Sequence, residues 1–419
     1  MKIGLRVLLF FLFITGYTQQ STVTTVNFEG AKRTKISFLE NFVKVRTGNL
    51  LDSLVLKEDV QRLKQLPSIA NAVFRVDANT ENHYSVVYTV EEHFTLIPFA
   101  NLYTSTNDEF AYRIGVQEYN LLGKNMILGG FYQRDIFNSY GINFRAPYII
   151  GGNLGFAMSY NNIATLEPVF INDLTADYKY KNKAFEVLGL YNINNKNKID
   201  FGINWFTEDY NYITGATSPN VPQDLKVDKY LYKLIYSYEN IEYDYHYRSG
   251  FSSVLNFQYV KSPDENLPEF LIGFNDFIYY KRLGYRGNWA NRLRLGIASN
   301  IDTPFAPFSV DNNVNIRGVG NKIDRGTGTI VFNTEYRYSF MDRDWFALQG
   351  NFFVDSGTWR NPGGDFSDFT DRESIRVYPG IGLRFIHKRV FNAIFRIDYG
   401  HGITKNASKG IVFGIGQYF

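Results

Sequence analysis

The chain has 419 residues and a net charge of +3, with 45% hydrophobic residues, 17% aromatic residues and no cysteine. So small a positive charge excludes a nucleic-acid partner held by a broad basic surface, and the lack of cysteine excludes disulfides and a cysteine-linked lipid anchor. The 31 tyrosines and 37 phenylalanines are far more than an ordinary soluble protein carries. They favour a transmembrane β-barrel, whose strands alternate between lipid and lumen and whose aromatic residues gather in two interfacial girdles.

The N-terminus, residues 1–20, has the pattern of a secretory signal peptide. Lys2 and Arg6 precede an apolar run from Val7 to Ile14, and small and polar residues follow. This run is far shorter than the ~20 residues that a membrane-spanning helix needs. We therefore expect export, with cleavage near Gly16 to Gln20.

Residues 21–92 differ from the rest and predict a small periplasmic domain. A short strand, Val23 to Phe28, is followed by two segments with helical spacing of apolar residues. Thr34 is a candidate cap for the first helix, and Pro67 ends the second. The apolar positions are Phe38, Leu39, Phe42 and Val43, then Leu56, Val60 and Leu63. Two strands, Ala72 to Asp77 and Tyr84 to Glu91, complete a β-α-α-β-β order.

From residue 93 to residue 419, strand candidates follow one another almost without interruption. Turn residues separate them, including Asn107-Asp108, Gly123-Lys124, Gly151-Gly152 and Asn194 to Asn197. Seventeen candidates start near residues 95, 109, 124, 138, 153, 168, 183, 198, 228, 249, 268, 287, 329, 345, 376, 391 and 409. Because single-chain bacterial barrels have an even number of strands, we expect one early candidate to be spurious or merged. The prediction is a mostly β protein with a sixteen-stranded antiparallel transmembrane barrel.

The last strands alternate between an apolar and a polar face. In the strand at 391–399, Phe391, Ala393, Phe395, Ile397 and Tyr399 are expected to face lipid, and Asn392, Arg396 and Asp398 the lumen. In the strand at 376–385 the lipid set is Val377, Pro379, Ile381, Leu383 and Phe385, and Arg376 and Arg384 face inward. In the closing segment Ile411, Phe413, Ile415 and Phe419 are expected to face lipid. An apolar outer face places the chain in an outer membrane.

A secreted β-sandwich or a soluble barrel would show the same alternation, so the loop lengths decide between the two. Tracing back from the C-terminus puts connections near 401–408, 356–375 and 301–328 outside the cell. Those near 341–344 and 387–390 fall inside. Long outer loops and short inner turns favour the outer membrane of a Gram-negative bacterium, with residues 21–92 in the periplasm.

The connection 301–328 carries the one site-like feature of the chain. It contains Arg317 set among glycines, including Gly318, in a pattern that suits tight packing. Parity places Glu335 and Asp355 inside the barrel on the next two strands. We infer that the loop folds into the lumen and that Arg317 bridges these two carboxylates, since a guanidinium suits such pairs. The alternative is that both carboxylates merely line a wet lumen among Arg337, Arg384 and Arg396.

In order and spacing, several motifs resemble the BamA/TamA-like outer-membrane insertase and translocator superfamily, also called the bacterial surface antigen family. They are the β-α-α-β-β domain, Ile316-Arg317-Gly318, Glu335, Phe353-Val354-Asp355-Ser356-Gly357, Gly380-Ile381-Gly382-Leu383-Arg384 and Gly414-Ile415-Gly416-Gln417-Tyr418-Phe419. The resemblance spans essentially the whole mature chain. It implies one periplasmic POTRA domain, a sixteen-stranded barrel, and an inserted sixth extracellular loop whose arginine, Arg317, contacts Glu335 and Asp355.

Two features depart from the family pattern. An aromatic residue usually follows the Arg-Gly pair, and this chain has Val319, which puts stacking contacts at the loop tip in doubt. The best-known insertase has five POTRA domains and the two-partner secretion translocators have two, whereas residues 21–92 have room for one. The chain is therefore not expected to be the principal assembly factor of its cell.

The leading functional hypothesis is help with inserting proteins into the outer membrane or moving polypeptides across it. Ala72 to Asp77 could pair with an extended client by β-augmentation, and a weak seam between the first and last strands would offer a second template. Glycines at 410, 414 and 416 would weaken the closing strand, or serve only curvature and aromatic packing. The partners expected are outer-membrane lipid, unfolded or extended polypeptides, and periplasmic proteins at the POTRA domain. We also expect Gly414, Gly416, Tyr418 and Phe419 to act as a C-terminal β-signal for the barrel's own assembly.

The rival hypothesis is a passive outer-membrane channel with the POTRA domain as a vestige or a docking site. An enzyme is the least favoured reading, because the chain has no Gly-x-Ser-x-Gly nucleophile elbow. Its five histidines lack metal-ligand spacing: His83, His93, His246, His387 and His401. We therefore expect no catalytic residue, no cofactor and no metal.

Overall fold

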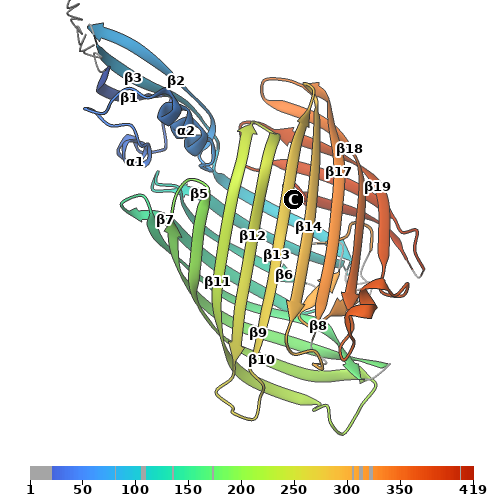
Figure 1. Cartoon of the computed structure of the whole chain (residues 1–419). Coiled ribbons are helices and arrows are strands. Elements are labelled where there is room, and N and C mark those ends of the chain that lie inside the picture. The colour runs from blue at the N-terminus through green and yellow to red at the C-terminus, as the bar shows by residue number, and fades with distance from the viewer. Residues whose placement is uncertain are drawn as a thin grey trace, which may run out of the picture.

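The computed structural model describes residues 21–80, 82–104, 110–134, 136–171, 174–303, 306–310, 315–319, 324–405 and 407–419. In this part of the chain a small N-terminal domain stands at one end of a large antiparallel β-barrel (Figure 1). The predicted signal peptide, the turn at Asn107-Asp108 and Gly320 of the long loop lie outside the described residues.

The small domain has the β-α-α-β-β order that the sequence predicts. Its elements are β1 (Thr22–Glu29), α1 (Ile36–Phe42), α2 (Ser53–Lys64), β2 (Ile69–Thr80) and β3 (His83–Glu92). β3 lies in the centre of a three-stranded sheet, parallel to β1 and antiparallel to β2. Within the described residues β2 pairs with β3 alone, so it is an edge strand.

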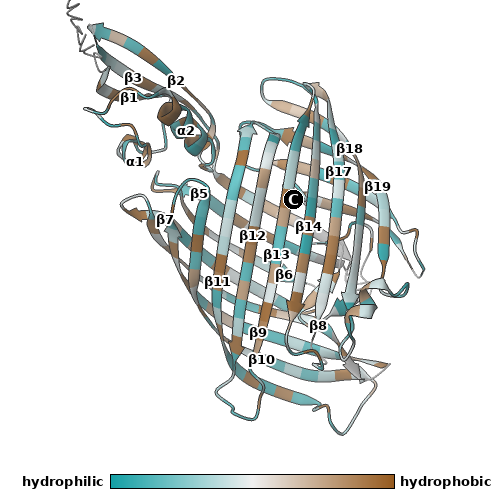
Figure 2. Ribbon diagram, viewed as in Figure 1, coloured by the Kyte–Doolittle hydropathy of each residue, from teal (hydrophilic) through white to brown (hydrophobic). Residues whose placement is uncertain are grey.

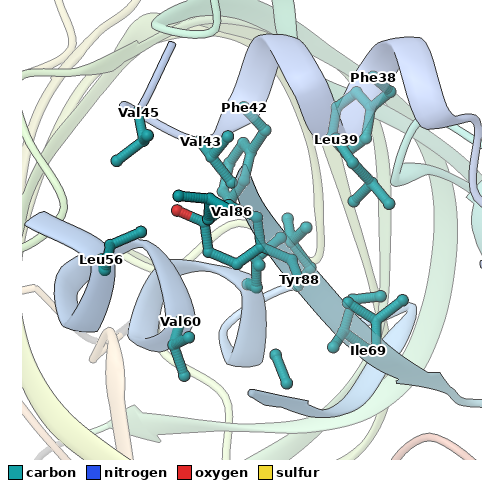
Figure 3. Packing of buried hydrophobic residues seen from close by; sticks show 14 of the residues in the cluster. Phe38, Leu39, Phe42, Val43, Val45, Leu56, Val60, Ile69, Val86 and Tyr88 are labelled. Atoms are coloured by element: carbon teal, nitrogen blue, oxygen red, sulfur yellow. The ribbon is translucent and has the colours of Figure 1, made fainter. Parts of the chain in front are cut away.

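The two helices cover one face of this sheet with their apolar stripes (Figure 3). Phe38 and Phe42 of α1 and Leu56 of α2 are buried against β3, where Tyr88 is fully enclosed. Each large side chain buried in this way contributes about 1.5–3 kcal/mol. Tyr148 of the barrel packs against Phe38 at a tilt and against Phe42 edge-on, with ring centroids 6.0 and 5.1 Å away. The core of the small domain therefore continues into the barrel.

The predicted helix cap at Thr34 is wrong. α1 begins after Lys35, whose side chain makes no capping hydrogen bond. Thr34 instead donates its N–H to the Glu92 carboxylate at 2.7 Å, and the N–H groups of Lys32 and Arg33 reach the same carboxylate. Burial works to raise the pKa of Glu92, but these three donors outweigh it and hold that pKa below its usual value. The carboxylate thus ties the end of β3 to the segment before α1.

Sixteen strands form the barrel, as predicted. They are β4 (Leu96–Thr104), β5 (Phe110–Leu121), β6 (Met126–Arg134), β7 (Asn138–Ile150), β8 (Leu154–Ile171), β9 (Leu174–Asn192), β10 (Asn197–Gly215), β11 (Asp224–Asp244), β12 (Tyr247–Lys261), β13 (Phe270–Leu283), β14 (Gly287–Ala298), β17 (Gly328–Asp342), β18 (Phe346–Arg360), β19 (Arg376–His387), β20 (Ile394–His401) and β21 (Lys409–Ile415). Each pairs antiparallel with its neighbour in the chain, except that β14 pairs with β17 across the long loop. The candidates near residues 153 and 168 are a single strand, β8.

Apolar and polar residues alternate along many of the strands, which Figure 2 shows as alternating bands. On β17, Phe332, Tyr336 and Phe340 point outward and are 41–45% exposed, whereas Glu335 and Arg337 between them are 1% exposed. The outer face is therefore the apolar one, as lipid requires. No described helix is long and apolar enough to cross a membrane.

The two ends of the barrel differ in the length of their connections. At the end that carries the small domain the connections are short: 122–125, 151–153, 193–196, 245–246, 284–286, 343–345 and 388–393. At the far end they include 216–223, 262–269, 299–327, 361–375 and 402–408. The loop 299–327 holds the short strands β15 (Phe308–Val310) and β16 (Asp324–Gly326), and 361–375 holds the 3-10 turn η1 (Phe366–Thr370). Although 135–137 and 172–173 at the far end are short, all of the long connections lie at that end, as is typical of bacterial outer-membrane barrels.

The small domain is bonded to the short turns of the barrel. The N–H of Lys35 donates to the carbonyl of Gly123 at 2.9 Å, and the N–H of Ser68 donates to the Asn125 side chain at 3.1 Å. On another turn, the Tyr245 hydroxyl donates to the Glu91 carboxylate at 3.1 Å. These contacts hold the domain over the barrel mouth.

The first and last barrel strands, β4 and β21, do not form a hydrogen-bonded ladder in the described part of the chain. A short bridge closes the sheet only next to the small domain, where the Phe94 N–H donates to Arg389 and the Phe391 N–H donates to Phe94, at 2.9 and 3.1 Å. β21 has 7 residues and β4 has 9, whereas β9 and β10 have 19 each. The barrel thus has a short, unpaired seam and, on strands β8 to β11 with 18 to 21 residues each, what we call the tall wall.

Two predictions at the end of the chain are wrong. The strand predicted from residue 391 begins at Ile394, and Phe391 packs against His93 and Tyr119 in the turn before it. Phe419 does not face lipid, because β21 ends at Ile415 and Gly416, with a φ of 90°, turns the chain into the lumen. Only glycine adopts such a φ without strain.

Candidate functional site in the barrel lumen

Residues 315–319 of the long loop lie in the lumen and are held there by their own apolar side chains. Ile316 and Val319 are 0% and 2% exposed and pack with Val331, Trp359 and Tyr378 of the barrel wall. The position that usually carries an aromatic residue is therefore filled by a valine that is buried in an apolar cluster. Stacking at the loop tip is replaced by aliphatic packing.

Gly318 brings the loop backbone into direct contact with the last two strands. Its φ is 92°, and a Cβ added to it would lie 2.7 Å from Gly400 of β20. A Cβ on Gly400 would lie 2.2 Å from the Arg317 carbonyl oxygen, and one on Gly410 of β21 would lie 3.3 Å from the Gly318 oxygen. Ser408 donates its hydroxyl to the same Gly318 oxygen at 3.2 Å. This approach requires glycine on both sides.

Arg317 is fully buried and forms two ion pairs with the residues that the sequence picked out. Its Nε and Nη2 donate to the two oxygens of Asp355 at 2.8 and 2.9 Å, and its Nη1 donates to Glu335 at 2.6 Å. The main-chain N–H of Arg317 adds a further bond to Asp355 at 3.0 Å. The structure therefore brings Arg317, Glu335 and Asp355 together in the lumen.

Further charged residues extend these pairs into a network that we call the lumenal ion cluster. Its members are Arg317, Glu335, Arg337, Asp355, Arg384, Arg396 and Asp398. Asp398 lies 3.6 Å from Arg317, 3.5 Å from Arg384 and 2.9 Å from Arg396. Both carboxylates thus hold the loop arginine, and Glu335 also contacts the wall arginines Arg337 and Arg384.

Two aromatic rings enclose the guanidinium group of Arg317. It lies 3.6 Å from the centroid of Phe353 on β18 and 4.3 Å from that of Tyr418, which follows β21. Nearby, Nη2 of Arg337 donates to the main-chain oxygen of Phe419 at 3.2 Å, and Nε of Arg384 donates to Gln417 at 3.2 Å. The residues after β21 therefore form part of the same cluster as the loop.

The geometry describes an anchor rather than a reactive centre. Every carboxylate of the cluster is paired with a guanidinium, and the ring faces exclude water from Arg317. Such a buried cluster adds little net stability, but removal of one partner is costly because it leaves the other charges unpaired. The cluster therefore fixes where the loop lies, and within the described residues no group of histidines and carboxylates has metal-binding geometry.

Sequence reasoning named Arg317, Gly318, Glu335 and Asp355 but missed the partners from the last two strands. Asp398 was recognised as an inward residue without a role. Gly400 is paired with Gly410 across β20 and β21, and that pair of glycines in register was the one signal for a close backbone approach. Nothing in the sequence around Tyr418 predicts its contact with Arg317, because the chain turns inward at Gly416 through a backbone angle.

The fold and the lumenal cluster define a class of protein: an outer-membrane-type barrel with one POTRA domain and a loop anchored inside the lumen. Residues 21–93 match the POTRA family, described as a surface antigen variable number repeat. The resemblance inferred from the sequence is thereby confirmed at the level of the fold.

Solved structures give the same picture. The chain is similar to BamA from Haemophilus ducreyi lacking POTRA domains 1-3, with 16% identity over 94% of this chain and 83% of that chain and a TM-score of 0.51. It is similar to CdiB from Acinetobacter baumannii, with 12% identity over 94% and 73% and a TM-score of 0.58. CdiB from Escherichia coli gives 11% identity over 94% and 76% and a TM-score of 0.62. A comparison with curated proteins found no match.

Proposed function

We propose that the protein assists the insertion of proteins into the outer membrane or the translocation of polypeptides across it. The observation that carries this proposal is the unpaired seam between β4 and β21. An unpaired strand edge in contact with lipid is costly, because lipid cannot satisfy its N–H and C=O groups. The edge of β4 is therefore a template that an incoming strand can satisfy. A passive pore needs no such edge.

The POTRA domain supplies a second edge on the periplasmic side of the proposed arrangement. β2 is unpaired on one side, and Val73 and Arg75 project from it to solvent. The opposite edge of the sheet, β1, is partly covered, since Val23 exchanges main-chain hydrogen bonds with Gly48 and Asn49. β2 is thus the strand on which an extended client would add by β-augmentation. The proposal assigns the protein no catalytic activity.

A passive channel is the second candidate, and one observation favours it. A cavity of about 750 Å³ lies on the lumenal side of the tall wall, between Phe206, Leu231 and Phe270 of the barrel and residues 299–303 of the loop. A solute could occupy this space without any opening of the seam.

Depletion of the protein separates the two candidates. The insertion or translocation proposal predicts that unfolded outer-membrane proteins or untransported polypeptides accumulate in the periplasm. A channel predicts normal levels of both, together with conductance of the purified protein in liposomes. Normal levels after full depletion would overturn the proposal.

Photo-crosslinking from β2 tests the docking strand. A crosslinker at Val73, which is 53% exposed, is expected to capture extended polypeptides in living cells. The matched control is Leu54 at the start of α2, which is 69% exposed on the same domain but lies on no sheet edge. Equal capture from both positions would show that exposure alone, and not the strand edge, accounts for the crosslinks.

A further inference from the structure

Lysines on the tall wall fall into two groups according to the face they occupy. Lys198, Lys229 and Lys233 face the lumen, and each forms an ion pair with a glutamate. Lys179, Lys181 and Lys183 of β9 have the same parity as Phe185, which is 43% exposed on the outer face. Among the ion pairs of the described residues none involves these three lysines. We call them the β9 lysine row.

A line of aromatic residues marks where the lysine row begins. Tyr160, Phe185, Trp205 and Tyr230 stand opposite one another on β8, β9, β10 and β11. The rings of Phe185 and Trp205 are stacked, with centroids 6.0 Å apart. Aromatic rings exposed on the outer face collect at the boundary between lipid tails and headgroups. Lys183 is the next outward residue on β9, on the side away from the POTRA domain.

The nearest neighbours of Lys183 across the sheet are polar and uncharged. Lys183 stands opposite Asn162 of β8 and Thr207 of β10, and Asn162 stands opposite Tyr140 of β7. The ammonium group of Lys179 lies 4.9 Å from the ring centroid of Phe137. Two outward carboxylates flank the row, Asp177 beyond Lys179 and Asp209 opposite Lys181. The row therefore keeps a net positive charge at headgroup level.

The adjacent part of the wall has the opposite character. Lys226 of β11 faces outward between Asp224 and Asp228 and stands opposite Asp209. Three carboxylates thus surround this lysine. The excess of positive charge is confined to β9, so the wall offers a local site rather than a uniformly basic surface.

We propose that the β9 lysine row binds the phosphate groups of an anionic glycolipid in the leaflet away from the POTRA domain. This inference rests on the proposed placement of the POTRA domain in the periplasm. Lysine is a regular phosphate ligand, and the amide of Asn162 and the hydroxyl of Tyr140 beside the row can bond sugar hydroxyls. The aromatic line below the row sits beside the first part of the acyl chains. Binding there fixes the depth of the tall wall, at a distance from the seam.

Binding of lipid A to the purified full-length chain in detergent tests the proposal. We expect bis-phosphorylated lipid A to bind and dephosphorylated lipid A to bind far more weakly. Each lysine near an anionic surface is worth about fivefold in affinity, so replacing Lys179, Lys181 and Lys183 by Gln should weaken binding about a hundredfold at low salt. Added salt should reduce the difference, because it screens exposed charges.

Lys226→Gln is the matched control, since it removes an outward lysine from the acidic part of the wall. It should change the affinity less than twofold. Equal binding by the triple variant and the wild type, or equal binding of the two forms of lipid A, would overturn the proposal. Folding of each variant is read from its heat-dependent migration on gels, and if the triple variant fails to fold, Lys181→Gln alone should still show the fivefold loss.

Labelling of intact cells separates failure of this inference from failure of the proposed placement. Because the chain has no cysteine, Lys183→Cys provides a single site for a membrane-impermeant maleimide. Labelling of intact cells at Lys183→Cys, with Leu54→Cys labelled only after permeabilisation, supports the placement even if lipid A does not bind. Labelling at Leu54→Cys alone in intact cells would reverse the orientation and overturn both proposals.

Discussion

The two walls of the barrel hold their charges in different ways. On the wall from β17 to β21, Arg317, Glu335 and Asp355 are 0–1% exposed and lie against a loop. On the tall wall the ion pair of Lys229 with Glu208 has side chains that are 20% and 15% exposed, and both residues line the lumenal cavity. The same lumen is therefore closely packed around its charges on one side and open to the cavity on the other. The number of charges alone does not make an anchor, because the free energy lost when an ion pair is broken depends on how deeply the pair is buried.

The largest expected effect comes from Arg317→Ala. The change leaves the buried carboxylates of Asp355 and Glu335 without their loop partner, which typically costs about 3–5 kcal/mol. We expect a folded barrel whose loop 299–327 is released from the lumen and cut quickly by added protease. Glu208→Gln breaks the partly exposed pair with Lys229 on the tall wall and should cost about 1 kcal/mol or less. Equal protease sensitivity and equal stability in both variants would erase the proposed difference between the walls.

Gly400→Val should displace the loop without removing any charge. Its Cβ would lie 2.2 Å from the Arg317 carbonyl oxygen, and overpacking of this kind costs about 1–3 kcal/mol. Gly350→Ala on β18 is the control, since the nearest atom there is 3.5 Å away. Denaturant midpoints in detergent measure both. A midpoint for Gly400→Val as high as that for Gly350→Ala would show that the loop does not rest on β20.

Acidification should weaken the contact between the turn 245–246 and β17 at the POTRA end of the lumen. His246, in the turn 245–246, lies 3.0 Å from the Ser339 hydroxyl, and burial lowers its pKa to about 4. Its ordinary pKa is about 6.5, so the folded form binds its proton less readily than an open form. The contact is therefore intact above pH 6.5 and weakens as the pH falls towards 4, by about 2 kcal/mol at pH 5.

Hydrogen exchange at residues 245–248 between pH 7.5 and pH 5 measures this loosening, after correction for the intrinsic rate. His246→Gln should remove the pH dependence. Asp244, Arg282, Asp342 and Lys388 also act on His246 electrostatically, so a dependence that persists in His246→Gln would assign the effect to them.

The smallest expected effect is that of Tyr418→Ala, which removes one of the two rings around Arg317. A cation–π contact of this kind is worth about 0.5–2 kcal/mol. Tyr418→Phe should be neutral, because the hydroxyl has no hydrogen-bond partner among the described residues. The rate at which protease cleaves the loop ranks the wild type, Tyr418→Phe and Tyr418→Ala. If Tyr418→Phe released the loop as fully as Tyr418→Ala, the ring would not be the part that matters.

Much of the fold and part of the anchor could be predicted because both depend on patterns of residues that are close together in the sequence. Alternation along β17 and β18 placed Glu335 and Asp355 in the lumen, and the glycines around Arg317 indicated close packing. The start of β20 was misplaced, because Phe391 continues the apolar alternation although Phe94 holds it in a turn. Alternation of apolar residues along the chain cannot distinguish a side chain that contacts lipid from one that contacts residues 93–94, just before β4.

The missed members of the cluster come from interactions over long distances in the sequence. The alternation of its strand predicts that Asp398 faces the lumen, but no neighbouring residue indicates that Arg317 is its partner. Tyr418 and Phe419 looked like a continuation of β21, and the change of direction depends on a single backbone angle at Gly416. Such angles are decided by the packing of the whole lumen.

The contact of Gly318 with Gly400 and Gly410 carries a consequence for the order of events during folding. Arg317 precedes Glu335 by 18 residues and Asp355 by 38, and the two glycines that receive the loop come later still. The loop therefore cannot make all of its contacts until β20 and β21 have joined the sheet. A loop with all of these contacts in place thus indicates that β20 and β21 have joined the sheet.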